Sequence, residues 1–375
     1  MSIRIAIASA TPHDRCETFV AAHIARLQSV VLVLTGGSLP EADGQGRWLL
    51  GTSKIARLQA MFRRTVLRQD RREQLRQRIV QLLRNEKVDI VLAEYGVTAM
   101  EMLPCCKAAG IPLVTYFLGF DAYRTKVIER YGNYRQLFAG GHTIIAVSHA
   151  VRDQLISLGA PAEKVVYNSC GADLQRFGTC DPAKAPPHFL AVGRFVDKKA
   201  PHLMLLAFAR VVRDHPEARL TMVGDGDLWE TCHQLVRAHG LEASVDLCGP
   251  KTPEEIAALQ QRSRAFVQHS VITSSNDREG TPVAMLEAMG AGLPVISTRH
   301  GDISELVAHG DRGLLCEERD VEGMAAHMLQ LAADPDLAAR MGRAGIDYVR
   351  GHHALTDRIA SLQEILQQAA TSPRT

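Results

Sequence analysis

Short apolar runs alternate with longer amphipathic stretches along most of the chain. The runs are nearly continuous in apolar residues, which is typical of parallel strands that are buried on both faces. They predict strands at residues 3–9, 30–34, 89–93, 112–116, 143–147, 164–167, 188–192, 219–223, 244–247, 265–268, 294–297 and 313–316. The amphipathic stretches predict helices at residues 17–28, 150–158, 200–214, 229–239, 253–261, 282–291, 321–332 and 354–369. This alternation predicts an α/β protein with doubly wound, Rossmann-like parallel sheets.

One segment interrupts the alternation. Residues 178–187 contain three prolines and a glycine and show no periodicity, so they are the expected linker. We therefore predict an N-terminal domain at 1–180, a C-terminal domain at 181–350, and a last helix within 351–375 that packs back on the N-terminal domain. In open parallel sheets, ligands bind beyond the carboxyl ends of the strands. Two such domains facing each other would form a cleft there.

The amino-acid composition excludes several classes of protein. With 46% hydrophobic and 22% charged residues, the 375-residue chain has the usage of a globular protein, and a net charge of +2 does not favour nucleic-acid binding. No apolar run is as long as a membrane span, and the N-terminus is expected to be a first strand, not a signal peptide. The eight cysteines form no Cys-x-x-Cys pair and the histidines are scattered. We expect reduced cysteines, a cytoplasmic location and no metal site.

The most informative run is Glu279-Gly-Thr-Pro-Val-Ala-Met-Leu-Glu287, which follows a predicted strand and a polar loop. Pro282 suits the first turn of a helix, and Thr281 is a candidate N-cap. The N–H groups from Gly280 through Val283 to Ala284 would form an anion site with the positive end of the helix dipole. Spacing alone leaves Glu279 and Glu287 equally open to a binding role and to an ordinary solvated one.

Two further loops follow predicted strands. In the run 192–200, Gly193 permits a sharp exit, and Arg194 and Lys199 could both face a diphosphate. Basic loop residues are more often simply solvated. In Val223-Gly-Asp-Gly, Gly224 could belong to a phosphate loop, although a turn that requires positive φ explains it more simply.

These motifs, with the later Gly292-Leu-Pro-Val-Ile run, resemble the retaining, nucleotide-sugar-dependent glycosyltransferases of family 4, which have the GT-B fold. The resemblance covers nearly the whole chain and is stronger in the second half. It implies that Glu279 binds hydroxyls of the donor sugar and Glu287 the ribose, and that Arg194 and Lys199 neutralise the departing diphosphate. It places the base near Gly249 and Lys251. It further implies a UDP- or GDP-sugar donor, no metal and no separate cofactor.

The first half departs from the family pattern. Glu17-Thr18-Phe19, which follows His13, resembles the variant found in enzymes that build bacterial exopolysaccharides. In residues 117–121, Gly119 and Asp121 match an acceptor-side motif, but Leu118 replaces its usual histidine. The leading interpretation is a hexosyltransferase that acts on a saccharide or lipid-linked acceptor. Leu118 keeps open an alternative, a nucleotide-sugar-binding protein with weak or lost transfer activity. An epimerase, a phosphorylase and a dehydrogenase fit the motifs less well.

A basic stretch marks the first half as well. Residues 54–84 contain ten Lys or Arg and two acids, with apolar residues at helical spacing. Such a surface can attract anionic lipid headgroups, which would place the protein on the inner face of the membrane. A solvated arginine-rich helix face explains the pattern slightly more simply.

Overall fold

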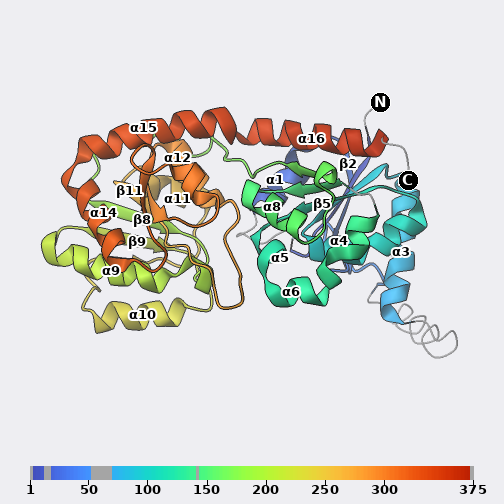
Figure 1. Ribbon diagram of the computed structural model, residues 1–375, viewed down its shortest axis with the longest axis horizontal. Helices are drawn as coiled ribbons and strands as arrows, with labels where there is room; N and C mark the ends of the chain where they lie inside the picture. The colour runs from blue at the N-terminus through green and yellow to red at the C-terminus, as the bar shows by residue number, and fades with distance from the viewer. Residues whose placement is uncertain (1–2, 12–17, 52–69, 141–142, 372–375) are drawn as a thin grey trace. The chain divides into compact units, whose positions relative to one another are not determined.

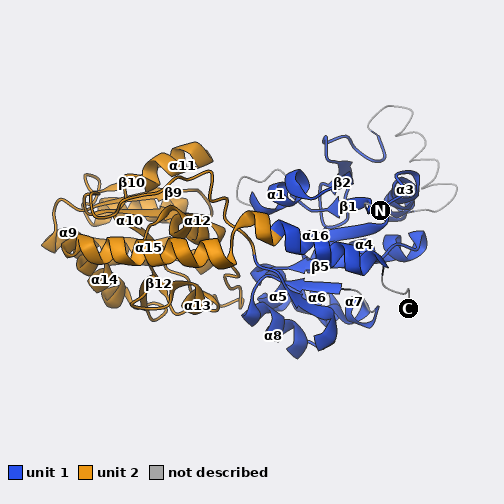
Figure 2. Cartoon of the chain, turned by 90° about the horizontal axis from the view of Figure 1, so that it is seen from above, with its two compact units in different colours: residues 1–169, 359–375 blue, residues 170–358 orange. Residues whose placement is uncertain are grey.

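A computed structural model describes residues 3–11, 18–51, 70–140 and 143–371. Contacts divide the chain into two compact units, residues 1–169 with 359–375 and residues 170–358 (Figure 2). The division falls about ten residues before the segment expected to be the linker. That segment is instead tied to the second unit, where Cys180 N–H donates to the carbonyl of Ala291 at 2.6 Å. The last residues of the chain, 359–375, group with the first unit.

The first unit contains a seven-stranded sheet in the order β3-β2-β1-β4-β5-β6-β7. Figure 1 labels β2 and β5 of this sheet. Its strands are β1 Ile5–Ala8, β2 Val30–Thr35, β3 Ala42–Asp43, β4 Ile90–Glu94, β5 Leu113–Phe117, β6 Thr143–Ala146 and β7 Val165–Tyr167. All pairs are parallel except the short edge pair β2–β3. The main helices of this unit are α1 Thr18–Arg26, α3 Arg71–Asn85, α4 Gly96–Ala109, α5 Gly119–Tyr123, α6 Thr125–Arg130, α7 Arg135–Ala139 and α8 His149–Ser157.

The second unit contains a six-stranded parallel sheet in the order β10-β9-β8-β11-β12-β13. Its strands are β8 His188–Val192, β9 Arg219–Val223, β10 Val245–Leu247, β11 Ala265–Val267, β12 Val295–Thr298 and β13 Gly313–Cys316. The helices are α9 Pro201–Asp214, α10 Trp229–Ala238, α11 Pro253–Gln260, α12 Val283–Ala291, α13 Ile303–Val307, α14 Val321–Ala333 and α15 Pro335–His352, after which α16 Leu355–Thr371 continues into the first unit.

Alternation along the strands explains why the second sheet is buried on both faces. Phe266 packs with α12 and α13, while its neighbours Ala265 and Val267 pack in the core that contains α9 and α14. A strand with an apolar layer on each face loses the polar–apolar alternation of a half-exposed strand. The sequence therefore identified the parallel strands, and the predicted doubly wound α/β class is confirmed.

The elements that were not predicted are mainly the helices α4, α5, α6, α7, α13 and α15 and the strand β3. Two of them, β3 and α15, have a clear reason. The antiparallel strand β3 has only two residues, too few to leave a pattern. Helix α15 contains Gly342 and Gly345, which lower helix propensity. A Cβ on Gly342 would lie 2.0 Å from the carbonyl oxygen of Gly292, so this glycine permits a close approach of α15 to the end of α12. The start signals of α15 were present, since Asp334 caps it and Pro335 opens it.

Candidate active site

The strand order of the second unit reverses at β8, which lies between β9 and β11. At such a switch point the loops leave in opposite directions and open a crevice. Lys199 lies in a short 3-10 turn after β8, and its Nζ donates to Oε1 of Gln268, directly after β11, at 3.2 Å. A pocket at this point is lined by Gly193, Arg194, Lys199 and Gln268, among others. The exposed Arg194 and the half-buried Lys199 thus line the same pocket.

Lys199 and Glu279 form the centre of the candidate site. Glu279 Oε2 lies 2.8 Å from Lys199 Nζ, with side-chain exposures of 11% and 15%. Oε2 makes no aligned hydrogen bond, so this is a charge contact that leaves the oxygen able to accept one. Burial raises the pKa of the Glu279 carboxyl, but the Lys199 and Lys198 ammonium groups outweigh burial and lower that pKa to about 2. The site therefore holds a fully ionised carboxylate.

The glycine loops at this edge of the sheet are packed against each other through their backbones. Gly193 N–H donates to the carbonyl of Val223 at 2.9 Å, and Gly224 N–H donates to the carbonyl of Gly249 at 3.0 Å. Gly224 has φ 129°, and a Cβ there would lie 2.1 Å from the Gly193 carbonyl oxygen. The simpler interpretation, that the backbone requires a glycine at position 224, is sufficient, and the loop borders the candidate site.

The predicted anion site lies at the start of α12. The helix begins at Val283, one residue later than expected, with Pro282 as N-cap and no side-chain cap hydrogen bond. The prediction that Thr281 caps this helix is therefore wrong, because the helix starts too late for its hydroxyl to take that place. Gly280, Thr281 and Pro282 are buried in the turn that connects Glu279 to the helix. The first N–H groups of a helix have no partner within the helix, so those at the start of α12 are suited to an anion.

Glu287 lies in the second turn of α12, and its environment differs from that of Glu279. Burial raises the pKa of the Glu287 carboxyl to about 7, opposed by the positive charge of Arg176 and assisted by the negative charge of Asp173. Both of those residues follow β7 in the sequence. The two glutamates of the motif are therefore held in different charge states near neutral pH, and only Glu279 lies against a lysine.

The raised pKa of Glu287 predicts a pH-dependent stability. The folded chain binds this proton more tightly than the ordinary value of 4.5 would allow, so the stabilisation is complete below pH 4.5 and is lost as the pH rises through about 7. We expect Glu287→Gln to remove this loss and to gain up to about 3 kcal/mol over the wild type between pH 5 and pH 8. Urea unfolding of both proteins at pH 5 and at pH 8 measures this difference in the free energy of unfolding. Glu322→Gln, at an exposed ion pair, is the control that should show no such gain.

Lys251, predicted to lie near the base, pairs with Glu255. Its Nζ lies 3.1 Å from Glu255 Oε1, and Glu255 also accepts the N–H of Thr252 at 2.7 Å in the capping box of α11. Lys251 therefore has an ion-pair partner, Glu255, four residues along the chain. Gly249 contributes its carbonyl to the Gly224 loop, so both residues lie at the same edge of the sheet as Arg194.

The acceptor-side residues lie in the first unit, where the structure gives Asp121 a backbone role. Its buried carboxylate accepts the N–H of Leu118 at 2.9 Å and the N–H of Gly96 at 2.5 Å. It thereby joins the start of α5, where Gly119 is buried, to the start of α4. Thr18 is exposed at the start of α1. Glu17 and His13 lie outside the described residues.

Several polar residues near these sites were not predicted from the sequence. They are Lys198, Gln268, His300 and Glu318 in the second unit, and the buried pair His23–Glu94, 2.7 Å apart, in the first. The available signal was position along the strands. Glu94 is the last residue of β4, Gln268 directly follows β11, and His300 follows β12 by two residues. Which partner each residue meets depends on neighbouring strands that are distant in sequence.

Comparison with known families fits this arrangement. The profile described as "Glycosyl transferases group 1" matches residues 181–348, and the one described as "Glycosyltransferase Family 4" matches residues 17–176. Together the two matches span nearly the whole chain. The chain belongs to the group 1, family 4 glycosyltransferases, which confirms the resemblance inferred from its motifs.

Two relatives are named for exopolysaccharide synthesis. WcaL of Salmonella typhimurium, a colanic acid biosynthesis glycosyltransferase, is 31% identical over 251 residues, covering 65% of this chain and 61% of WcaL. AmsK of Erwinia amylovora, an amylovoran biosynthesis glycosyltransferase, is 31% identical over 259 residues, which cover 68% of this chain and 64% of AmsK. Each alignment thus spans somewhat less than two thirds of the relative.

Solved structures show the same fold. HepE of Anabaena, solved in complex with UDP and glucose, has a TM-score of 0.77 at 19% identity and covers 98% of this chain and 100% of its own. A glycosyltransferase from Rickettsia africae has a TM-score of 0.73 at 15% identity and covers all of both chains. At these identities the likeness concerns the fold alone, and it confirms the expected GT-B fold class with two Rossmann-like domains.

Proposed function

We propose that this protein is a retaining hexosyltransferase that moves a sugar from a UDP- or GDP-sugar to a saccharide or lipid-linked acceptor in bacterial polysaccharide synthesis. The observation that carries the proposal is the contact of Lys199 with Glu279 at the switch point of the second sheet, beside Arg194. A cation and an ionised acid at such a crevice suit a ligand that has both a diphosphate and sugar hydroxyls.

Each residue then has a distinct task. Glu279 accepts hydrogen bonds from hydroxyls of the donor sugar, while Glu287 accepts them from the ribose. Arg194, Lys199 and the first N–H groups of α12 stabilise the negative charge that develops on the departing nucleotide, as preorganised donors do in a low-dielectric site. Gly249 and Lys251 lie near the base. In this proposal these groups do the work without a metal ion or a further cofactor.

The names of relatives support both nucleotides. HepE was solved with UDP and glucose, whereas a Mycobacterium tuberculosis relative, 28% identical over 244 residues, is named a GDP-mannose-dependent mannosyltransferase of a phosphatidylinositol monomannoside. WcaL and AmsK are named for polysaccharide synthesis. A test must therefore include both bases and both acceptor types.

The experiment is a binding and transfer panel. UDP- and GDP-sugars are titrated by calorimetry, and each binder is then incubated with saccharide and polyprenyl-linked saccharide acceptors, with and without a metal chelator. We expect one base to be preferred and the anomeric configuration of the donor to be kept in the product. Retention by front-face attack suits a site in which leaving-group cations are the main catalytic groups. An inverted product contradicts this mechanism, and binding without transfer to any acceptor favours a binding protein.

We also propose a peripheral contact with anionic membrane through the region 54–84. Residues 54–69 of this region lie outside the described part of the chain. In α3, Arg71 pairs with Glu41 at 2.6 Å and Arg72 with Glu101 at 2.6 Å. Among the residues the structure describes, no helix is both long and apolar enough to cross a membrane.

Vesicle sedimentation tests this contact. Charge reversal at Arg63, Arg64, Arg71 and Arg72 should abolish salt-sensitive binding to vesicles that contain phosphatidylglycerol, because surface charge drives it. Charge reversal at the exposed Arg340, Arg343 and Arg350 of the second unit is the control. Equal binding by the two variants contradicts the contact.

A further inference from the structure

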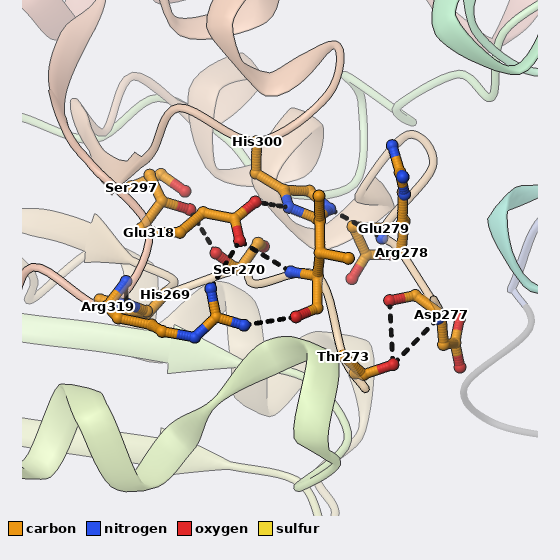
Figure 3. Close-up of polar contacts among 12 residues, drawn as sticks. His269, Ser270, Thr273, Asp277, Arg278, Glu279, Ser297, His300, Glu318 and Arg319 are labelled. Atoms are coloured by element: carbon orange, nitrogen blue, oxygen red, sulfur yellow. Dashed lines mark hydrogen bonds and ion pairs between the residues drawn. The ribbon is translucent and has the colours of Figure 1, made fainter. Parts of the chain in front are cut away.

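His300 lies between the backbone of Glu279 and the carboxylate of Glu318 (Figure 3). This residue follows β12 by two positions, and its side chain is 1% exposed. The N–H of Glu279 donates to His300 Nε2 at 3.0 Å, and His300 Nδ1 lies 2.6 Å from Glu318 Oε1. The imidazole therefore connects the candidate catalytic loop to the loop after β13.

These two contacts define the protonation state of the ring. An amide N–H can only donate, so Nε2 must be the unprotonated, accepting nitrogen. Nδ1 then carries the hydrogen and donates it to Glu318. Burial raises the pKa of the Glu318 carboxyl, but the N–H of Ile272 and the His300 ring outweigh burial and lower it, which keeps the acceptor ionised. A carboxylate that fixes the tautomer of a histidine in this way determines what its other nitrogen can bind.

The loop from Ile272 to Glu279 is held at its start by Glu318 and by its neighbour Arg319. Glu318 Oε2 accepts the N–H of Ile272 at 2.9 Å, and Arg319 donates to the Ile272 carbonyl at 2.5 Å (Figure 3). Glu318 thus accepts a hydrogen bond from the start of the loop directly. It is connected to the end of the loop through His300.

Lys198 also holds the part of the loop just before Glu279. The buried Lys198 donates to the carbonyl of Arg278 at 3.2 Å and lies 3.3 Å from Asp277 Oδ1. Lys198 is the neighbour of Lys199, whose ammonium contacts the Glu279 carboxylate. The start of the loop and its last three residues are therefore held, and the last residue carries the Glu279 side chain that contacts Lys199.

We propose that His300, oriented by Glu318, is a positioning residue that holds the peptide of Glu279 and thereby keeps its carboxylate against Lys199. It does so without touching the donor, since its two ring nitrogens are both engaged by the protein. The proposal rests on the proposed function, in which Glu279 binds the donor sugar. It adds a residue outside the Glu279–Glu287 motif on which transfer depends.

Kinetics give the first test. His300→Ala removes the acceptor for the Glu279 N–H, and we expect kcat to fall about 10- to 100-fold, the size of effect that misplacing a reacting group by about 1 Å produces. His300→Gln offers an amide oxygen in place of Nε2 and should recover most of the loss. His309→Ala is the matched control, because His309 Nδ1 also accepts a backbone N–H, that of Leu315 at 2.9 Å, away from this loop. It should retain wild-type kcat.

A double-mutant cycle separates positioning from a general structural effect. If His300 acts through Glu279, then His300→Ala should cost little further activity in a Glu279→Gln background. A full additional loss in that background overturns the proposal, as does a folded His300→Gln variant no better than His300→Ala.

A measurement independent of transfer keeps this test distinct from that of the proposed function. Carbon-13 NMR of labelled glutamate should show the Glu279 carboxyl ionised at pH 4 in the wild type and partly protonated in His300→Ala, because it has moved from Lys199. An unchanged, ionised carboxyl in His300→Ala overturns the positioning role even if no transfer is found. Absence of transfer with the expected NMR change contradicts the proposed function only.

Discussion

Lys199→Met is expected to lower the kcat for sugar transfer by about 100-fold, the cost of about 3 kcal/mol that follows from removing one preorganised donor to a developing anion. Methionine keeps the length and apolar stem of lysine but not its charge. The ammonium contacts both Gln268 and Glu279 at the switch point, and methionine can make neither polar contact. Steady-state kinetics with the preferred nucleotide sugar measure the loss.

The same variant has a second expected effect, on the acid side of the pH profile. Lys199 is the strongest of the charges that lower the pKa of Glu279, so its removal raises that pKa from about 2. Activity that requires the ionised carboxylate should then fall off at a higher pH than in the wild type. Lys184→Met is the control, because Lys184 is 86% exposed and pairs only with Asp181 in the described structure. Near wild-type kcat in Lys199→Met would remove the proposed role of this cation.

The structure brings several of the predicted donor-side residues to one edge of the second sheet, because parallel sheets collect their loops there. Arg194, Lys199, Gly224 and Glu279 each follow a predicted strand, and the structure places those strands in one sheet with β8 at the switch point. Local patterns were enough for this, since the runs that form buried strands are continuous and apolar.

Partners across the sheet could not be predicted in the same way. His300 and Glu318 are separated by 18 positions, and nothing in their local sequence shows that β12 and β13 are neighbours with this register. Asp121 illustrates the opposite case, in which a motif position is recognisable but its carboxylate is bound to the backbone N–H groups of Leu118 and Gly96. Side-chain identity was visible in the sequence, whereas hydrogen-bond partners depended on tertiary contacts.

Gly224→Ala is expected to destabilise the second unit by about 3 kcal/mol or more, since it combines overpacking with an unfavourable backbone conformation. The new Cβ would lie 2.1 Å from the carbonyl oxygen of Gly193 and 2.9 Å from its carbonyl carbon. Both neighbours are backbone, so relief requires the loop that leads into Arg194 to move. We therefore expect weaker nucleotide binding as well as a lower urea midpoint.

Gly240→Ala separates the two causes. Gly240 also has positive φ, 65°, but a Cβ there meets nothing within 4 Å. It should cost only the conformational strain of a left-handed residue, about 1 kcal/mol, and leave nucleotide affinity unchanged. Equal losses in the two variants would mean that the close approach of the Gly193 and Gly224 loops contributes nothing. A larger loss in Gly224→Ala, together with weaker nucleotide binding, would show that this backbone contact sets the position of Arg194.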